Sequence, residues 1–161
     1  MLNFTRPTST ASATDLVWPF QGRHLVSELM GSPGAPIALG QLMNDFPTVT
    51  DITPVGFLDD KPVFACTVET ADMDVMNYTS GNLFALISRI AGEQFDVIGR
   101  AYQLLCWERD HRHCGRCGEE TSLADKGQSR ACEPCGLSVY CLLYTSPSPR
   151  DRTRSRMPSS A

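Results

Sequence analysis

The chain has 161 residues, of which 42% are hydrophobic and 20% charged, enough for one domain or two small ones with a buried core. No apolar run reaches the roughly 18 residues that a membrane span needs, and the N-terminus lacks the charged-then-apolar layout of a secretory signal. We therefore expect a cytoplasmic protein that does not enter a membrane. Thiols stay reduced in the cytoplasm, where clustered cysteines hold metal more often than they form disulfides.

The first fourteen residues, MLNFTRPTSTASAT, are rich in Ser and Thr and contain one Arg and no acid. An organelle transit peptide has a similar composition, but a disordered start of the chain is the interpretation that we favour. We therefore predict a disordered N-terminus over residues 1–14 and begin the first domain at Asp15.

From Asp15 to about Thr70 the sequence has short β-like patterns. The segments APIALG (35–40) and TVTDITPVGF (48–57) are candidate strands. Residues 55–69, VGFLDDKPVFACTVE, predict a hairpin with Asp59 and Asp60 in its turn. Both faces of the second strand of this hairpin are apolar, so we expect that strand to lie inside a sheet.

Two segments with helical spacing follow. In residues 81–94 one apolar stripe is formed by Leu83, Phe84, Ile87 and Ile90. Ser80 or Asn82 is placed to cap that helix. In residues 95–112 a second stripe is formed by Val97, Ile98, Ala101, Leu104 and Leu105. Strands followed by helices predict an α+β fold, with a small β-sheet and helix domain over residues 15–111.

Four of the seven cysteines lie in two Cys-x-x-Cys pairs, Cys114/Cys117 and Cys132/Cys135. Zinc prefers four such donors in a tetrahedron, and each pair presents two thiolates from one tight turn. The glycines and the proline beside the pairs suit those turns: Gly115, Gly118, Pro134 and Gly136. The fourteen residues between the pairs fit a short hairpin around residues 124–130. We predict a structural zinc ribbon over residues 112–140, with these four cysteines as the metal ligands.

Other interpretations of the cysteines are less favoured. A thioredoxin-type redox site needs one pair at the start of a helix, whereas here two pairs lie among turns. A catalytic zinc keeps an open position, and four cysteines leave none. His111 and His113 flank the first pair and are alternative ligands, although an exposed role is favoured with four thiolates available. We expect Cys66 and Cys106 to be small buried hydrophobes, and Tyr102 and Trp107 to pack the last helix.

Residues 144–161, YTSPSPRDRTRSRMPSSA, contain four Arg and one Asp, which leaves a charge of −7 on residues 1–143. An acidic body argues against non-specific nucleic-acid binding. The basic end cannot bury enough apolar surface to become ordered. It is either an RNA-binding or phosphorylated arm, a solvated end without a role, or translated adapter or vector sequence joined to a truncated gene. We favour the last because the composition changes abruptly after Tyr140, and we predict a disordered, non-native tail over residues 141–161.

The runs RAYQLLCWERDHRHCGRCGEET (100–121) and RACEPCGLSVY (130–140) resemble the NAD(H) pyrophosphatases of the Nudix hydrolase superfamily. In that family a helix that ends in an ALL-x-W pattern leads into a four-cysteine zinc ribbon. The residues in register with this pattern are Leu104, Leu105, Trp107, His111 and Cys114. The hairpin at 56–69 looks like part of the family's N-terminal domain, so the resemblance covers about residues 36–140.

The resemblance implies cleavage of NAD(H) to NMN(H) and AMP and, in some members, removal of NAD caps from RNA. It also implies a homodimer and Mg2+ or Mn2+ on a glutamate-rich helix, where the ions activate a water. Tyr140 corresponds to the tyrosine after the second knuckle that helps to bind the nucleotide. No Nudix box (Gly-x5-Glu-x7-Arg-Glu-x2-Glu-Glu-x-Gly) occurs in the sequence, and no acidic cluster has helical ligand spacing. We therefore assign no catalytic residue and predict that the chain as written is inactive.

Two functions remain open. The first is a zinc-binding N-terminal fragment of an NAD(H) pyrophosphatase, without membrane or nucleic-acid partners of its own. The second is a free-standing zinc-ribbon module that binds protein or nucleic acid through its basic tail. The preference of the parent enzyme among NADH, NAD+ and NAD-capped RNA depends on contacts outside this sequence.

Overall fold

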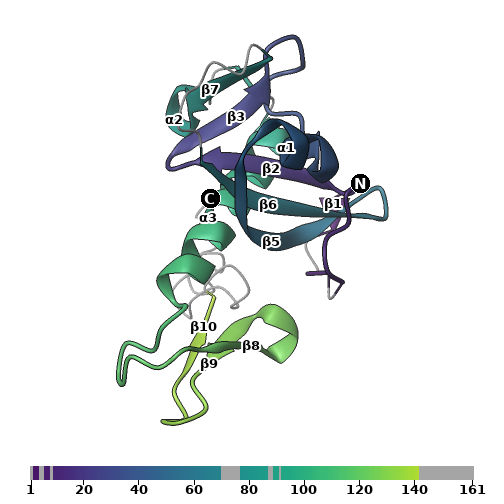
Figure 1. Cartoon of the computed structure of the whole chain (residues 1–161). Helices are drawn as coiled ribbons and strands as arrows, with labels where there is room; N and C mark the ends of the chain where they lie inside the picture. Colours follow the sequence, from purple (N-terminus) through teal and green to yellow (C-terminus); the bar gives the residue numbers. More distant parts are fainter. Residues whose placement is uncertain are drawn as a thin grey trace, which may run out of the picture.

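The computed structural model describes residues 2–3, 6–7, 9–69, 77–86, 89–90 and 92–141. A mixed sheet with helices lies at one end of the molecule and a small antiparallel sheet at the other, joined by one long helix (Figure 1). The predicted α+β class is confirmed. Within the described residues, no helix has the length and apolarity needed to cross a membrane.

The large sheet has the order β1-β5-β6-β2-β3-β7, and β4 pairs with β2 at one side of this path. Its strands are β1 Leu2–Asn3, β2 Leu16–Gln21, β3 His24–Glu28, β4 Ile37–Ala38, β5 Thr48–Leu58, β6 Lys61–Glu69 and β7 Tyr78–Asn82. The pair β2/β6 is parallel and the other pairs are antiparallel. We predict a strand at residues 35–40, and only Ile37–Ala38 of that segment is a strand. A helix begins at Leu39.

The hairpin predicted at residues 55–69 is formed by β5 and β6. Its register pairs Leu58 with Lys61, so Asp59 and Asp60 form a two-residue turn. Both aspartates have left-handed backbone, with φ of 47° and 64°, the conformation that lets a tight turn follow the twist of the strands. Strand β6 lies between β5 and β2, which confirms the predicted interior position.

The core lies on both faces of the large sheet, which is covered by α1 (Leu39–Asp45), α2 (Leu83–Leu86) and α3 (Gly92–Asp110). Alternate residues of a strand face opposite sides, so Val63 and Ala65 of β6 contact the α3 side while Phe64 and Cys66 join the α1 side. The predicted stripe of α3 is buried in full: Val97, Ile98, Ala101, Leu104 and Leu105.

The predicted stripe at residues 83–90 is only partly correct. Leu83 and Ile90 are buried, but Phe84 is 73% exposed, and Ile87 lies outside the described residues. Helix α2 is a single turn, in which successive residues point about 100° apart, so Leu83 faces the core while Phe84 faces solvent. The expected cap is present, since the Phe84 N–H donates to Asn82 Oδ1 at 3.0 Å.

Parts of the segment 1–14, for which disorder is predicted, contact the large sheet, while the disorder of the segment as a whole stays a prediction. Strand β1 pairs with the end of β5, with Leu2 opposite Leu58 and Asn3 opposite Phe57. Arg6 is 6% exposed. The physical reason is that this arginine finds a carboxylate and two carbonyl oxygens within the fold, contacts that local composition does not reveal.

The small sheet consists of β8 Ser122–Ala124, β9 Ser129–Ala131 and β10 Ser138–Tyr140, in the order β10-β9-β8. The turn η1, Asp125–Gly127, joins β8 to β9, as predicted for residues 124–130. Cys141, the first residue of the predicted tail, is buried, and its N–H donates to Gln128 O at 2.9 Å. It packs against the core of the large sheet, while the disorder of the tail stays a prediction. Residues 142–161 lie outside the described residues.

Candidate metal centre and its junction with the large sheet

The sulfur atoms of Cys114, Cys117, Cys132 and Cys135 all lie within 4.8 Å of one another. Cys114 Sγ is 3.5 Å from Cys135 Sγ, and Cys117 Sγ is 3.4 Å from Cys132 Sγ. Four sulfurs placed about 2.3 Å from a tetrahedral zinc would be about 3.8 Å apart. No cysteine of the chain forms a disulfide. The donor set therefore fits a structural Zn2+ with four thiolate ligands.

The two Cys-x-x-Cys turns have the same backbone hydrogen bonds. In each, the glycine after the second cysteine donates to the carbonyl of the first, and the first cysteine donates to a carbonyl five residues later. These bonds are Gly118 N to Cys114 O (2.8 Å), Cys114 N to Glu119 O (2.7 Å), Gly136 N to Cys132 O (2.8 Å) and Cys132 N to Leu137 O (2.8 Å). Both glycines have left-handed φ, 79° and 68°, which explains why glycine suits these two positions.

Backbone donors stabilise one sulfur as a thiolate. The N–H of Arg116 lies 3.4 Å from Cys114 Sγ. Backbone hydrogen bonds lower the pKa of Cys114 to about 6, and the bond from Arg116 has a larger effect than the one from Cys117. A zinc ligand must be deprotonated, so this thiol is ready to bind metal near neutral pH.

The histidines beside the first pair lie apart from the sulfur cluster. His111 Nδ1 is 2.8 Å from Trp107 O. The centroids of the His111 and Trp107 rings are 5.4 Å apart, and the two rings are tilted to one another. His113 is exposed. Among the described residues, the group that can hold a metal contains four cysteines and no histidine. The preference for thiolate ligands over His111 and His113 is therefore supported by the geometry.

The remaining residues singled out in the sequence occupy different environments. Tyr102 packs on Phe20, with 5.3 Å between the ring centroids, as expected. Trp107 is partly buried and packs against the same core, also as expected. Cys66 is fully buried, and burial raises the pKa of its thiol to about 12. Cys106 is only half-buried, which differs from the expectation because it follows the buried Leu105 and lies about 100° further around α3.

Tyr140 lies on the edge strand β10 and is 54% exposed. A hydrogen bond with Asp125, in the turn between β8 and β9, raises the pKa of Tyr140. Its side chain is thus accessible on the surface of the ribbon. A role in nucleotide binding stays a prediction.

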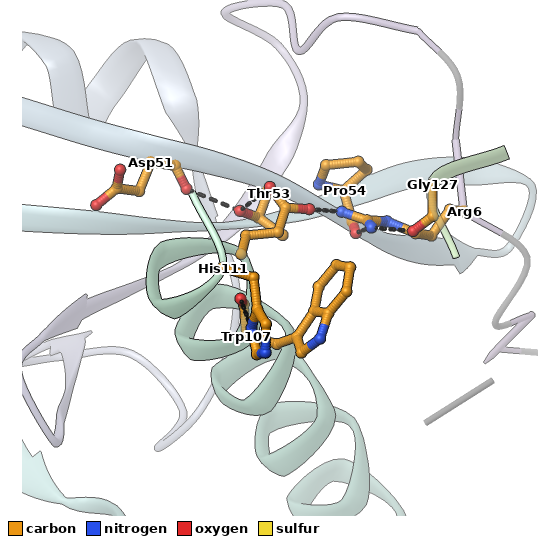
Figure 2. A network of polar contacts seen from close by, with 8 residues as sticks. Arg6, Asp51, Thr53, Pro54, Trp107, His111 and Gly127 are labelled. Carbon is orange, nitrogen blue, oxygen red and sulfur yellow. Dashed lines mark hydrogen bonds and ion pairs between the residues drawn. The ribbon is translucent and has the colours of Figure 1, made fainter. Parts of the chain in front are cut away.

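Sequence reasoning missed a buried polar network where the ribbon meets the large sheet. The Arg6 side chain is 2% exposed and forms an ion pair with Glu108 of α3, which is 16% exposed. Arg6 also donates through Nε to Pro54 O at 3.1 Å and through a terminal nitrogen to Gly127 O. Figure 2 shows Arg6 between these two carbonyl groups. We call this group, Arg6, Pro54, Glu108 and Gly127, the Arg6 junction.

Two further contacts surround the Arg6 junction. The buried Thr53 hydroxyl lies 3.1 Å from Asp51 O (Figure 2) and 3.4 Å from Glu108 Oε2. Asp51 also forms an ion pair with Arg112, the first residue of the ribbon. A signal for this network was present in the sequence, since Glu108 follows Ala101 by seven residues and therefore lies on the apolar stripe of α3. A carboxylate on a buried stripe requires a partner.

A cavity of about 550 Å³ lies beside the Arg6 junction. Its walls come from the N-terminal segment, from β5 and β6, and from the ribbon, and they include Arg6, Ile52, Pro54, Leu123 and Gly127. Ile52 and Leu123 are 40% and 47% exposed. The ribbon and the large sheet thus line a half-open space of mixed polarity at their junction.

A four-cysteine cluster held by two matched turns and a three-stranded sheet defines a zinc-ribbon protein. Residues 109–140 match the sequence profile of the NADH pyrophosphatase zinc ribbon domain. Together with the relatives described next, this match supports membership of the NAD(H) pyrophosphatase family.

The relatives are proteins named NAD-capped RNA hydrolase NudC. One from Pseudomonas putida is 31% identical over 86 residues, covering 53% of this chain and 31% of the relative. One from Pseudomonas fluorescens is 30% identical over 89 residues, with the same two coverages of 53% and 31%. One from Deinococcus radiodurans is 28% identical over 120 residues, covering 74% of this chain and 39% of the relative. The chain therefore spans about a third of the length of these curated relatives.

Proposed function

We propose that the chain is the zinc-binding N-terminal part of an NAD(H) pyrophosphatase, an enzyme that cleaves NAD(H) to NMN(H) and AMP. The observation that carries this proposal is the match of residues 109–140 to the NADH pyrophosphatase zinc ribbon, in a segment whose four sulfurs lie within 4.8 Å. The relatives named NAD-capped RNA hydrolase suggest NAD-capped RNA as a second substrate of the parent enzyme. In this proposal the parent is a cytoplasmic homodimer.

The proposed role of the zinc is structural. Four cysteine ligands complete a tetrahedron, so the metal keeps no position for water or substrate. Zinc supplies folding energy to a segment that buries almost no large apolar side chain. Bound by Cys114, Cys117, Cys132 and Cys135, it would hold Tyr140 at a defined place relative to α3. The divalent ions of the hydrolysis itself, Mg2+ or Mn2+, would belong to a glutamate-rich helix that this sequence does not contain.

The deciding experiment is a DNA read through the codon for Tyr140 in the source genome. We expect the reading frame to continue into Pro-Arg or a similar pair and then a Nudix box, in place of residues 141–161. The protein expressed from that longer frame should release AMP from NADH with Mn2+. Independent reads that reproduce residues 141–161 followed by a stop codon would contradict the fragment interpretation and the non-native tail.

The second candidate is a free-standing zinc-ribbon module that binds nucleic acid. It is favoured by one observation, the four Arg among residues 144–161. Titration of a labelled single-stranded RNA with the full chain at low and moderate salt distinguishes the two. Phosphate contacts by the tail would give a binding constant that falls steeply with salt, whereas the first proposal expects no measurable binding by this chain.

A further inference from the structure

The Arg6 junction connects three parts of the chain that are distant in sequence. The three nitrogens of the Arg6 guanidinium are divided among the Pro54 carbonyl of β5, the Gly127 carbonyl of the ribbon turn, and the carboxylate of Glu108 on α3. Arg6 and Gly127 are 121 positions apart. A guanidinium is planar and its donor directions are fixed. It can therefore bond to all three acceptors only when β5, α3 and the ribbon turn are held in one arrangement relative to one another.

The position of the Gly127 carbonyl depends on the fold of the ribbon. Asp125, Lys126 and Gly127 have consecutive left-handed φ of 49°, 56° and 80°, a turn that aims this carbonyl at Arg6. The turn lies between the two cysteine pairs, inside the loop that zinc would close. The buried residues of the described segment 112–141 are Cys114, Thr121, Ser129, Cys132 and Cys141. Because none of them is a large hydrophobe, the ribbon depends on its metal rather than on an apolar core.

The other side of the Arg6 junction depends on the large sheet. The Pro54 carbonyl and the Thr53 hydroxyl come from β5, next to a shift in its register with β6 between Thr50 and Thr53. Asp51 at this irregularity has φ of 53° and pairs with Arg112 at the entrance to the ribbon. The same distorted part of β5 therefore contacts the N-terminal segment, the end of α3 and the start of the ribbon.

We infer that Arg6 is a positioning residue that couples zinc occupancy of the ribbon to the docking of the N-terminal segment on the large sheet. With zinc bound, the ribbon turn presents Gly127 O and completes the burial of Arg6. Without zinc, the turn loses its fixed place, and the buried guanidinium lacks one of its three acceptors. Coupling between two sites is reciprocal, so Arg6 in turn stabilises the zinc-bound ribbon.

The coupling has a consequence for the molecular surface. The cavity of about 550 Å³ takes its walls from the N-terminal segment, β5, β6 and the ribbon turn. Release of the ribbon and of the N-terminal segment would widen this cavity, expose the buried Phe64 and uncover more of the already part-exposed Ile52 and Leu123, which line it. Zinc loss should therefore appear as new apolar surface at this junction, while the rest of the large sheet stays folded.

The first test needs no substitution. Hydrogen exchange of the full chain is followed by mass spectrometry, with zinc bound and after chelation under reducing conditions. We expect peptides that contain Arg6 to exchange faster after chelation, whereas peptides from β6 (Lys61–Glu69) keep their protection. Unchanged exchange around Arg6 after zinc removal would overturn the inference.

The second test measures the reciprocal effect. Zinc affinity is measured by competition with a coloured chelator for the full chain carrying Arg6→Met, with Arg109→Met as the matched control, since Arg109 is exposed and its side chain pairs with the neighbouring Asp110. We expect Arg6→Met to weaken zinc binding about tenfold, within the usual range of coupling between sites, and Arg109→Met to leave it unchanged. Arg6→Lys keeps the charge but not the three donor directions. Its effect on zinc binding should lie between those of Arg6→Met and Arg109→Met.

A purely local stabilising role of Arg6 predicts a different result. In that case Arg6→Met would lower the unfolding midpoint of the large sheet and leave the zinc affinity equal to that of Arg109→Met. This outcome would overturn the inference. If Arg6→Met does not fold, the exchange experiment on the unsubstituted chain decides the question by itself.

Discussion

The sulfur atoms of Cys117 and Cys132 lie 3.4 Å apart although the two residues are separated by 15 positions. The hairpin of β8 and β9 spans that separation and returns the chain to the first knuckle. Two thiols at this distance repel one another as thiolates unless a cation lies between them. The proximity of the sulfurs therefore agrees with the predicted zinc.

We expect purified protein to contain about one zinc per chain, the stoichiometry of a four-thiolate site. Cys132→Ser should lose the metal, because three thiolates and a hydroxyl bind zinc more weakly, while β5 and β6 remain folded. Cys106→Ser is the matched control, since Cys106 lies outside the cluster. Elemental analysis measures the metal and circular dichroism the fold. Zinc near zero in the unsubstituted protein under reducing conditions would contradict the site.

We expect this chain alone to leave NADH intact in the presence of Mn2+. In the part of the chain that the structure describes, the group able to hold a metal is the cysteine cluster, which has no carboxylates for divalent ions bridging a pyrophosphate. Chromatography of the reaction for AMP provides the measurement, with a full-length relative as the positive control. AMP formation that survives further purification would show a catalytic site in this chain.

We expect Cys66 to resist alkylation in the folded protein at pH 8, and Cys106 to react. Burial raises the pKa of Cys66 from 9.0 to about 12, so almost no thiolate is present at that pH. The folded-state pKa lies above the unfolded one. The contribution of this group to stability is therefore complete below about pH 9 and is lost as the pH rises from 9 toward 12.

Mass spectrometry after iodoacetamide treatment gives the modified cysteines, and urea unfolding between pH 8 and 11 gives the stability. Equal labelling of Cys66 and Cys106 in folded protein would mean that Cys66 is accessible.

We expect Thr53→Val to lower the free energy of unfolding by about 1–3 kcal/mol, the usual effect of leaving a buried polar group without its partner. Thr53 is 1% exposed, and its hydroxyl contacts Asp51 O and Glu108 Oε2. Thr79→Val on β7 is the matched control because Thr79 is exposed. Urea denaturation of both variants provides the comparison. Equal midpoints for the two variants would show that the Thr53 hydroxyl adds nothing to the junction.

Several features were correctly predicted from the sequence because their causes are local. The turn of Asp59 and Asp60 follows from two residues that tolerate left-handed backbone between two apolar runs. The buried stripe of α3 follows from helical periodicity. The zinc ribbon follows from the spacing of its cysteines and from the glycines that each knuckle requires.

Other features were decided by the tertiary structure alone. The N-terminal composition predicts disorder, yet Arg6 is buried because Glu108 and Gly127, about one hundred or more positions away in sequence, supply its partners. Cys141 follows the last ribbon strand and is buried because the core of the large sheet reaches it. Phe84 is exposed because, on the single turn α2, it points about 100° away from Leu83, which faces the core. Local periodicity and spacing determine turns, helices and metal knuckles, whereas a buried ion pair depends on distant segments that only the folded chain brings together.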